Sequence, residues 1–231
     1  MKGFFDHHIA LDIPEDRMED NEKVLTTRYT PLGVVGAICP WNFPIILSLG
    51  KVVPALLTGN TIILKPSPYT PYTGLKIVEL AQDILPPGVV QAIGGDDKLG
   101  PMLTQHPGIS KISFTGSIAT GKKVMAACAS TLKRVTLELG GNDASIVLPD
   151  VDIQKTAPEL VMGAFQNSGQ VCVATKRIYI HEDIYDEMLK AMVEFTKTVK
   201  VGDPESGALL GPIQNEMQVS SIIATSPPDI S

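Results

Sequence analysis

The sequence predicts an α/β protein in which helices cover both faces of a parallel β-sheet. Three observations lead to this prediction. Short apolar runs typical of buried strands alternate with longer segments of helical period, and turn residues separate them. The composition, with 44% apolar and 5% aromatic residues, suits an α/β protein. Strands that alternate with helices at this spacing indicate βαβ units, which build parallel sheets.

Residues 28–140 form the first predicted domain. Its strands are expected at residues 33–38, 61–65, 89–93, 111–114 and 134–139. Its helices are expected at residues 45–57 and 71–85, in a short segment that ends near residue 106, and in a segment that ends at residue 129. Turn residues bound these elements: Gly59 and Asn60 close the first helix, and Pro66 ends the second strand.

A second, partial domain is expected over residues 141–213. Its strands are predicted at residues 144–148 and 176–181, and its helices at residues 151–165 and 183–199. The flanking segments are expected to be irregular: residues 1–27 as a charged lead-in and residues 214–231 as a tail. His7 and His8 have no cysteine or carboxylate at ligand spacing, so no metal site is expected.

The charge pattern argues against several classes of partner. The net charge is −6 and the lysines are spread along the chain, so we expect binding neither to nucleic acid nor to a membrane surface. Lys51 and Pro54 interrupt the apolar run at residues 45–57, which is too short to span a bilayer. The three cysteines show no metal-ligand spacing and no disulfide framework, and the N-terminus lacks a signal-peptide core. A reducing, cytoplasmic location is therefore expected.

Polar and glycine residues collect where the predicted strands end. Ligands of parallel α/β sheets bind at the carboxyl ends of the strands. The candidates at these ends are Asn42, Lys65, Gly94, Gly116, Ser117 and Glu138. Each also has a purely structural interpretation, such as a turn asparagine, a surface lysine, a helix N-cap or a solvated carboxylate. Taken singly, the residues leave both interpretations open.

Cys172 follows a stretch of small and polar residues, 166–171, between a predicted helix and a predicted strand. A substrate can reach a thiol on such a turn, and Gly169 allows close backbone approach. Because the thiolate is the nucleophile, a catalytic cysteine needs a polar or electropositive pocket, or a nearby base. The alternative is a buried packing cysteine, which is what we expect of Cys39 and Cys128.

Five short motifs occur in an order that resembles the NAD(P)-dependent aldehyde dehydrogenase family. They are Pro-Trp-Asn-Phe-Pro at 40–44, Leu-Lys-Pro-Ser at 64–67, Phe-Thr-Gly-Ser at 114–117, Glu-Leu-Gly-Gly at 138–141 and Gly-Gln-Val-Cys at 169–172. They resemble, in this order, the family's oxyanion loop, ribose-binding strand end, pyrophosphate loop, general-base segment and nucleophile loop. The resemblance covers residues 28–213, and the ordered set is much more specific than any single motif.

The resemblance implies a Rossmann-like coenzyme-binding domain followed by part of an α/β catalytic domain, in a family whose members form homo-oligomers. It implies Cys172 as the nucleophile, Glu138 as the general base and Asn42 as an oxyanion donor. The cofactor-binding residues that it implies are Trp41, Lys65, Ser67, Gly94, Gly116, Ser117, Leu139 and Gly140. The substrate would be a small-molecule aldehyde.

The chemistry of these residue types fits the implied roles. Addition of the Cys172 thiolate to an aldehyde makes a tetrahedral carbon, which can lose hydride to NAD(P) and leave a thioester. The Asn42 side-chain amide and the Cys172 backbone N–H are candidate donors to the oxygen that becomes negative. Glu138 would then activate the water that releases a carboxylic acid. A CoA-acylating relative would pass the thioester to CoA, but Glu138 favours hydrolysis.

The sequence departs from the family pattern in two respects. Pro68 stands where many NAD-preferring members have an acidic residue, so NADP is open although NAD is favoured. The chain is also less than half the usual length: the N-terminal part of the family's coenzyme domain is missing, and so are its later motifs after Pro212. We therefore expect a truncated member with weak or no turnover on its own. A non-catalytic nucleotide-binding or regulatory protein of the same fold is the alternative.

Overall fold

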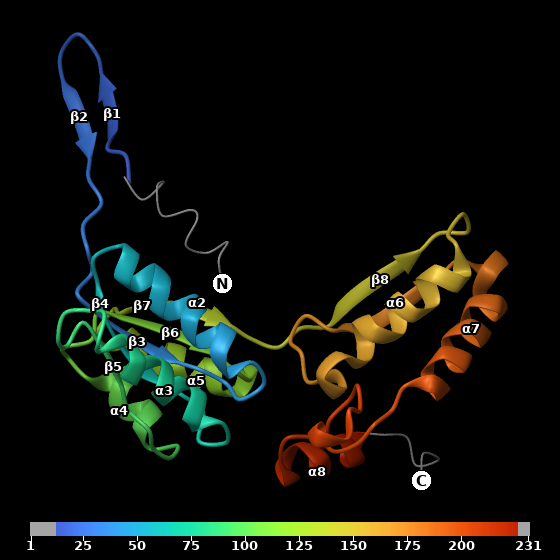
Figure 1. The fold of residues 1–231 in the computed structure, drawn as a ribbon. Helices are drawn as coiled ribbons and strands as arrows, with labels where there is room; N and C mark the ends of the chain where they lie inside the picture. Colours follow the sequence, from blue (N-terminus) through green and yellow to red (C-terminus); the bar gives the residue numbers. More distant parts are fainter. Residues whose placement is uncertain (1–12, 226–231) are drawn as a thin grey trace. The chain divides into compact units, whose positions relative to one another are not determined.

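The computed structural model describes residues 13–225, and the chain divides into two compact units, Met1–Glu138 and Leu139–Ser231 (Figure 1). His7 and His8 lie outside the described residues. The division falls close to the domain boundary predicted near residue 140. Within residues 13–225, no helix is both long and apolar enough to cross a membrane.

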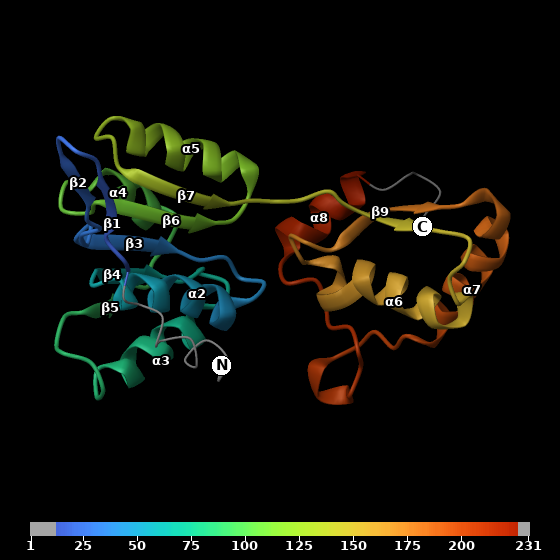
Figure 2. The ribbon, with the colours of Figure 1, turned by 90° about the horizontal axis from the view of Figure 1, so that it is seen from above.

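The first unit contains a parallel sheet whose five strands lie side by side (Figure 2). In chain order they are β3 (Val34–Ile38), β4 (Thr61–Lys65), β5 (Val90–Ala92), β6 (Lys111–Thr115) and β7 (Arg134–Glu138). Their order across the sheet is β5-β4-β3-β6-β7, and every neighbouring pair is parallel. The predicted fold class is thereby confirmed. The register pairs Ile38 with both Lys65 and Phe114, so these three strands end at one edge.

Helices cover both faces of this sheet. They are α2 (Pro44–Leu57), α3 (Pro71–Ala81), α4 (Leu99–Gln105) and α5 (Ile118–Ala129). On one face, Val52 of α2 and Val78 of α3 pack with Ile62 and Leu64 of β4 in a buried apolar cluster. Because the strand order reverses between β3 and β6, right-handed crossovers place α5 on the opposite face. There α5 packs against α4, β6 and β7.

The second unit is built on two parallel strands and the helices that pack on them. In chain order its elements are β8 (Asp143–Val147), α6 (Ile153–Phe165), η2 (Gln166–Gly169), β9 (Thr175–Ile180), η3 (Glu182–Ile184), α7 (Tyr185–Thr198), η4 (Pro204–Ser206) and α8 (Glu216–Thr225). Asp152 caps α6 by accepting a hydrogen bond from the Lys155 amide. Val147, Ala157 and Met188 join the strands to α6 and α7 in a small core.

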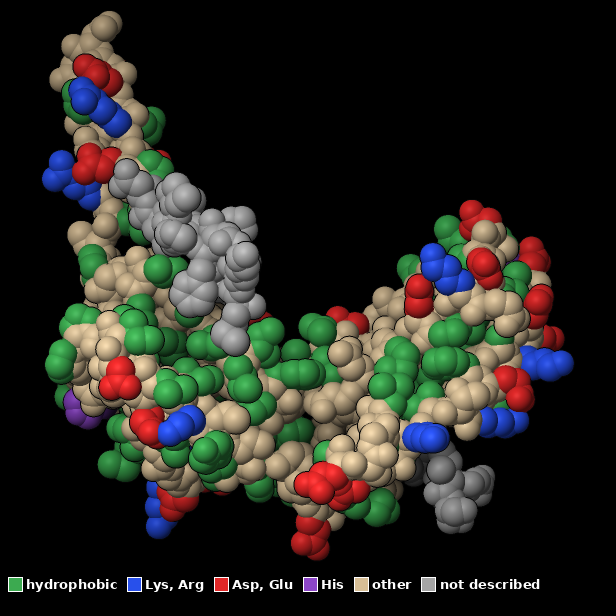
Figure 3. All heavy atoms as spheres, viewed as in Figure 1, with side chains coloured by type: hydrophobic (Ala, Val, Ile, Leu, Met, Phe, Trp, Pro, Cys, Tyr) green, Lys and Arg blue, Asp and Glu red, His purple; other side chains and the backbone are tan. Residues whose placement is uncertain are grey.

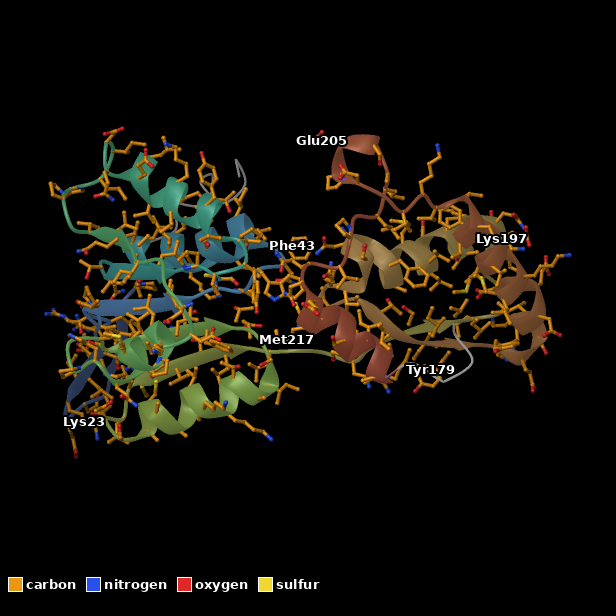
Figure 4. All side chains as sticks on the ribbon, turned by 90° about the horizontal axis from the view of Figure 1, so that it is seen from below. Lys23, Phe43, Tyr179, Lys197, Glu205 and Met217 are labelled. Atoms are coloured by element: carbon orange, nitrogen blue, oxygen red, sulfur yellow. The ribbon has the colours of Figure 1, made fainter. Side chains whose placement is uncertain are left out.

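The two strands of this sheet also carry large exposed apolar side chains. Ile146 of β8 is 76% exposed and Tyr179 of β9, labelled in Figure 4, is 54% exposed. On the face drawn in Figure 3, hydrophobic side chains of both units reach the surface. The β8–β9 sheet, with its exposed apolar side chains, differs from most parallel sheets, which are covered on both faces.

Two segments that we expected to be irregular contain regular structure. Within residues 1–27, β1 (Asp16–Glu19) and β2 (Val24–Thr27) form an antiparallel hairpin. The Asp20 carboxylate accepts hydrogen bonds from the amides of Glu22 and Lys23, and this side-chain turn connects the strands. Within the predicted tail, residues 216–225 form α8.

Replacement of Leu64 by alanine tests the core of the first unit. Leu64 is fully buried in β4, so Leu64→Ala removes buried apolar area and leaves a cavity. We expect a loss of about 2–5 kcal/mol in the free energy of unfolding, measured by urea titration. Leu80→Ala is the matched control, because Leu80 on α3 is 57% exposed. An equal loss in the two variants would contradict this assignment of the core.

Candidate active site

The first unit brings its predicted site residues to one edge of the sheet. Two of them follow β3, two lie at the end of β4, one follows β5, two follow β6 and one ends β7; in that order they are Trp41, Asn42, Lys65, Ser67, Gly94, Gly116, Ser117 and Glu138. Because all five strands are parallel, these positions share the carboxyl edge. The strand order reverses between β3 and β6, which is where α/β sheets open a crevice for ligands.

The ends of β3 and β4 are tied together. The Cys39 amide donates to the Lys65 carbonyl at 3.0 Å, and the Thr70 hydroxyl donates to the Trp41 carbonyl at 3.3 Å. The loop after β3, with Phe43 labelled in Figure 4, is thereby joined to the segment after β4. Asn42 is half-buried in this loop.

Lys65 is not the surface lysine that an isolated lysine would suggest. It is only 5% exposed, and its ammonium donates to the Pro66 carbonyl at 3.3 Å. Burial holds the pKa of Lys65 below 10.5, and the carboxylates of Asp97 and Asp96 oppose that shift. A partly desolvated cation at the carboxyl edge suits an anionic or hydroxyl-rich ligand.

The start of α5 has the features of an anion-binding helix terminus. Ser117 caps α5 by accepting a hydrogen bond from the Thr120 amide at 3.2 Å, and the first turn contains no acidic residue. The Gly116 amide donates to the Glu138 carbonyl at 3.1 Å. A Cβ at Gly116 would lie 2.5 Å from the Cζ atom of Phe114, so any larger residue there would displace the Phe114 ring.

Sequence reasoning overlooked Lys51, which it treated only as an interruption of an apolar run. On α2 this lysine is buried, and its ammonium donates to the Thr115 hydroxyl at 2.6 Å at the end of β6. Burial lowers the pKa of Lys51, while Cys39 and the carboxylate of Glu138 act to raise it. A lysine on the apolar face of a predicted helix is the signal that could have identified this buried cation.

The cysteines divide as the sequence predicted. Cys39 and Cys128 are buried in the first unit, and burial raises the pKa of both thiols. Cys172, in the second unit, is only partly buried. Three successive residues before it have positive φ: Asn167 at 53°, Ser168 at 57° and Gly169 at 73°. The first two lack the freedom of glycine, so this backbone is strained and must be held by its surroundings.

Several contacts hold the loop. The Ser168 hydroxyl donates to the Gly211 carbonyl at 2.6 Å. Gln170 accepts from the Gln214 amide at 2.9 Å and donates to the Asn167 carbonyl at 3.0 Å. The segment that follows η4 thus supports the turn before Cys172, and sequence patterns gave no sign of it.

Leu139 and Gly140 begin the second unit, and Gly141 lies against the Cys172 loop. A Cβ at Gly141 would lie 2.6 Å from the Cys172 carbonyl oxygen, and it would also meet the Asp143 carboxylate. A Cβ at Gly140 would meet no heavy atom within 4 Å. Of this pair of glycines, therefore, only Gly141 is required by packing.

Each unit thus presents its own share of the predicted chemistry. The first carries Asn42, Glu138 and a polar carboxyl edge of the kind that binds dinucleotides. The second carries a partly accessible cysteine on a strained, supported loop. Together, the fold and these residues define the class as α/β proteins with a dinucleotide-type sheet and, in a separate unit, a partly accessible cysteine.

Comparison with known proteins specifies the family. The model of the aldehyde dehydrogenase family matches residues 7–225. Aldehyde dehydrogenase LUC3 from a Fusarium species is 51% identical over 216 residues, which cover 94% of this chain and 45% of that protein. The chain belongs to the aldehyde dehydrogenase family.

Solved structures agree. An aldehyde dehydrogenase of Mycobacterium tuberculosis complexed with NAD⁺ aligns with a TM-score of 0.91 and 36% identity, over 96% of this chain and 46% of that one. The C291A mutant of AldC from Pseudomonas syringae, complexed with NAD⁺ and octanal, aligns with a TM-score of 0.85 and 35% identity, over 96% of this chain and 47% of that one. The chain therefore spans about half the length of the relatives it matches.

The buried ammonium of Lys51 predicts a pH-dependent contribution to stability. At low pH the folded and unfolded chains both hold the proton, and the desolvation cost is fully present. Between the lowered pKa and 10.5 the unfolded chain binds more protons, so the free energy of unfolding rises with pH. Each unit of lowered pKa corresponds to about 1.4 kcal/mol.

We therefore expect the wild-type chain to gain stability relative to Lys51→Met as pH rises from neutrality towards 10.5. Urea titrations at several pH values measure this difference. Lys123→Met is the control, since it removes one positive charge from an exposed position on α5. A wild-type advantage that falls with pH would contradict the expectation.

Gly141→Ala should displace the Cys172 loop, because the added methyl group overlaps the Cys172 carbonyl oxygen. We expect a loss of about 1–3 kcal/mol in stability, as is typical of overpacking, and faster amide hydrogen exchange in residues 170–174. Gly140→Ala is the matched control, and it should change neither quantity appreciably. Equal effects of the two substitutions would show that the close approach at Gly141 is not a constraint.

Proposed function

We propose that this chain carries the aldehyde-oxidising chemistry of its family, in which an aldehyde is converted to a carboxylic acid through a cysteine thioester. The observation that carries the proposal is the environment of Cys172. It is the partly accessible cysteine, on a strained loop held by the Gly211 and Gln214 backbone, whereas Cys39 and Cys128 are buried. The octanal complex of a structural relative supports an aldehyde as substrate.

In the proposed reaction, the Cys172 thiolate attacks the aldehyde carbon and makes it tetrahedral. The negative charge that forms on the carbonyl oxygen needs hydrogen-bond donors. The Asn42 side-chain amide and the Cys172 backbone N–H are the proposed donors, and loss of one such donor typically lowers the rate by about 10²–10³.

The carboxyl edge of the first unit fits NAD(P). The first turn of α5 offers amide donors without an opposing carboxylate, which suits a pyrophosphate, and Lys65 and Ser67 suit the ribose hydroxyls. Trp41, Gly94, Gly116, Ser117, Leu139 and Gly140 complete the proposed set. Bound there, NAD(P) supplies the hydride acceptor. We favour NAD. NADP stays open, because Pro68, which is exposed after the ribose-binding motif, places no carboxylate against a 2′-phosphate.

Glu138 is the proposed general base for the second half of the reaction. It ends β7 and is exposed, so water can reach its carboxylate. Glu138 would take a proton from the water that attacks the thioester carbon, and Cys172 would leave as the thiolate. The product is a carboxylic acid.

Free cysteines suit a reducing compartment such as the cytoplasm. The small-molecule substrate would be an aldehyde, and a homo-oligomer follows the family pattern.

A labelling experiment with an assay tests the function. We expect an electrophile such as iodoacetamide to modify Cys172 at least about tenfold faster than Cys39 or Cys128, as mapped by peptide mass spectrometry. With aldehyde and NAD⁺, we expect weak NADH production that Cys172→Ala abolishes and Asn42→Ala lowers by about 10²–10³. Robust turnover would contradict the expectation of weak activity. Equal labelling of all three cysteines would contradict the assignment of Cys172 as the nucleophile.

Glu138→Gln separates the two halves of the reaction. This variant should form the thioester and release it slowly, so an acyl adduct should accumulate on Cys172 and be visible in the mass spectrum. Addition of CoA to the wild-type chain checks the alternative acceptor. Formation of acyl-CoA rather than acid would overturn the role of Glu138 as a hydrolytic base.

A further inference from the structure

The Lys176 ammonium binds three backbone carbonyls of the cysteine loop, residues 166–174. Its ammonium nitrogen lies 3.1 Å from the carbonyl oxygens of Val171 and Cys172 and 3.0 Å from that of Ala174. Lys176 is exposed at the start of β9, the strand that the loop enters. An ammonium has three N–H donors, so this arrangement uses all of them on one short segment.

These contacts restrict the loop more than neutral hydrogen bonds would. Hydrogen bonds from a charged donor are generally stronger than those between neutral groups. The Ala174 amide also donates to the Val171 carbonyl at 3.2 Å and closes a turn around Cys172. Gly141 lies against the Cys172 carbonyl oxygen, so the peptide group between Cys172 and Val173 has little room to rotate.

The direction of the Cys172 amide follows from the peptide geometry. The Val171 carbonyl and the Cys172 N–H belong to one planar peptide group, and in a trans peptide they point in opposite directions. The described peptide bonds are all trans. Because Lys176 holds the Val171 carbonyl, the Cys172 N–H points away from the ammonium.

We propose that Lys176 is a positioning residue that orients the Cys172 N–H as an oxyanion donor. This inference rests on the proposed function, because it assigns Lys176 to the donor that the reaction needs. The lysine acts through the backbone and touches neither substrate nor cofactor. An arginine would serve less well, since its planar guanidinium cannot direct three N–H groups at carbonyls gathered around a single nitrogen.

Two reactions of the Cys172 thiol distinguish a loss of oxyanion-donor positioning from a general loss of thiol reactivity. Iodoacetamide alkylates sulfur by displacing iodide, and no oxyanion forms. p-Nitrophenyl acetate forms a tetrahedral oxyanion when the Cys172 sulfur bonds to its acyl carbon, and p-nitrophenolate then leaves. Both rates are measured on the full chain, with the modified residue identified by mass spectrometry.

The variants are Lys176→Met, which keeps much of the chain length without donors, and Lys176→Arg, which keeps the charge. Lys155→Met, at an exposed position on α6, is the control. We expect Lys176→Met to slow acylation by at least about tenfold, within the range for a lost oxyanion donor, and to change alkylation less than about threefold. Lys176→Arg should restore acylation only in part.

The inference is overturned if Lys176→Met slows both reactions equally, if it leaves acylation unchanged, or if Lys176→Arg restores acylation fully. The first result indicates an effect on the thiolate, and the last indicates an effect of charge alone.

Amide hydrogen exchange separates failure of this inference from failure of the proposed function. Lys176→Met should speed exchange in residues 170–174 at least about tenfold relative to Lys155→Met, because the loop loses three charged hydrogen bonds. Unchanged exchange overturns the inference whatever Cys172 does. Faster exchange, in a chain whose wild-type Cys172 reacts no faster than Cys39 or Cys128, shows that Lys176 holds the loop and that the proposed chemistry fails.

Discussion

The parallel pairing of β3 with β4 and with β6 is the constraint on which the first unit depends. This register brings Ile38, Lys65 and Phe114 level, so the chain leaves three strands at the same edge. Motifs that are far apart in the sequence thereby become neighbours without any direct attraction between them. Helices packed on both faces then bury the strands, and the candidate residues lie at the carboxyl edge that the helices leave uncovered.

The cysteine loop of the second unit is held in a different way. It has no place in a regular ladder, and Asn167 and Ser168 adopt a backbone that costs free energy. Side chains offset this cost: Ser168 and Gln170 bond to the segment at 211–214, and Lys176 binds the carbonyls that follow. The proposed residues of the first unit are therefore positioned by the hydrogen-bond ladder of the sheet. Cys172 in the second unit is positioned by individual side-chain contacts.

Strands and helices could be predicted from the sequence because their burial requires a regular apolar pattern. The five strands of the first unit lie within about two residues of their predicted positions, as boundaries fray. The β1–β2 hairpin was missed because both strands are exposed and carry no alternation, and α8 was missed because its period is weak. The candidate site residues at strand ends were proposed from motif order, since spacing alone left each one ambiguous.

The contacts of Lys51 and Lys176 could not be predicted in the same way. Each depends on a partner brought close by tertiary structure, Thr115 in one case and the loop carbonyls in the other. A single sequence contains no periodic signal for such a contact. The motifs therefore predicted candidates for the reacting residues, but not the side chains that hold the surrounding loops in place.

The exposed apolar side chains of strands β8 and β9 favour self-association of the protein in concentrated solution. Each strand has one neighbour in the described part of the chain, and Ile146 and Tyr179 face outward. Unpaired strand edges beside apolar side chains act as templates for further strands from other molecules. Self-association should consequently increase as the protein concentration rises, and Ile146→Lys would oppose it without disturbing the core beneath, because Ile146 is exposed.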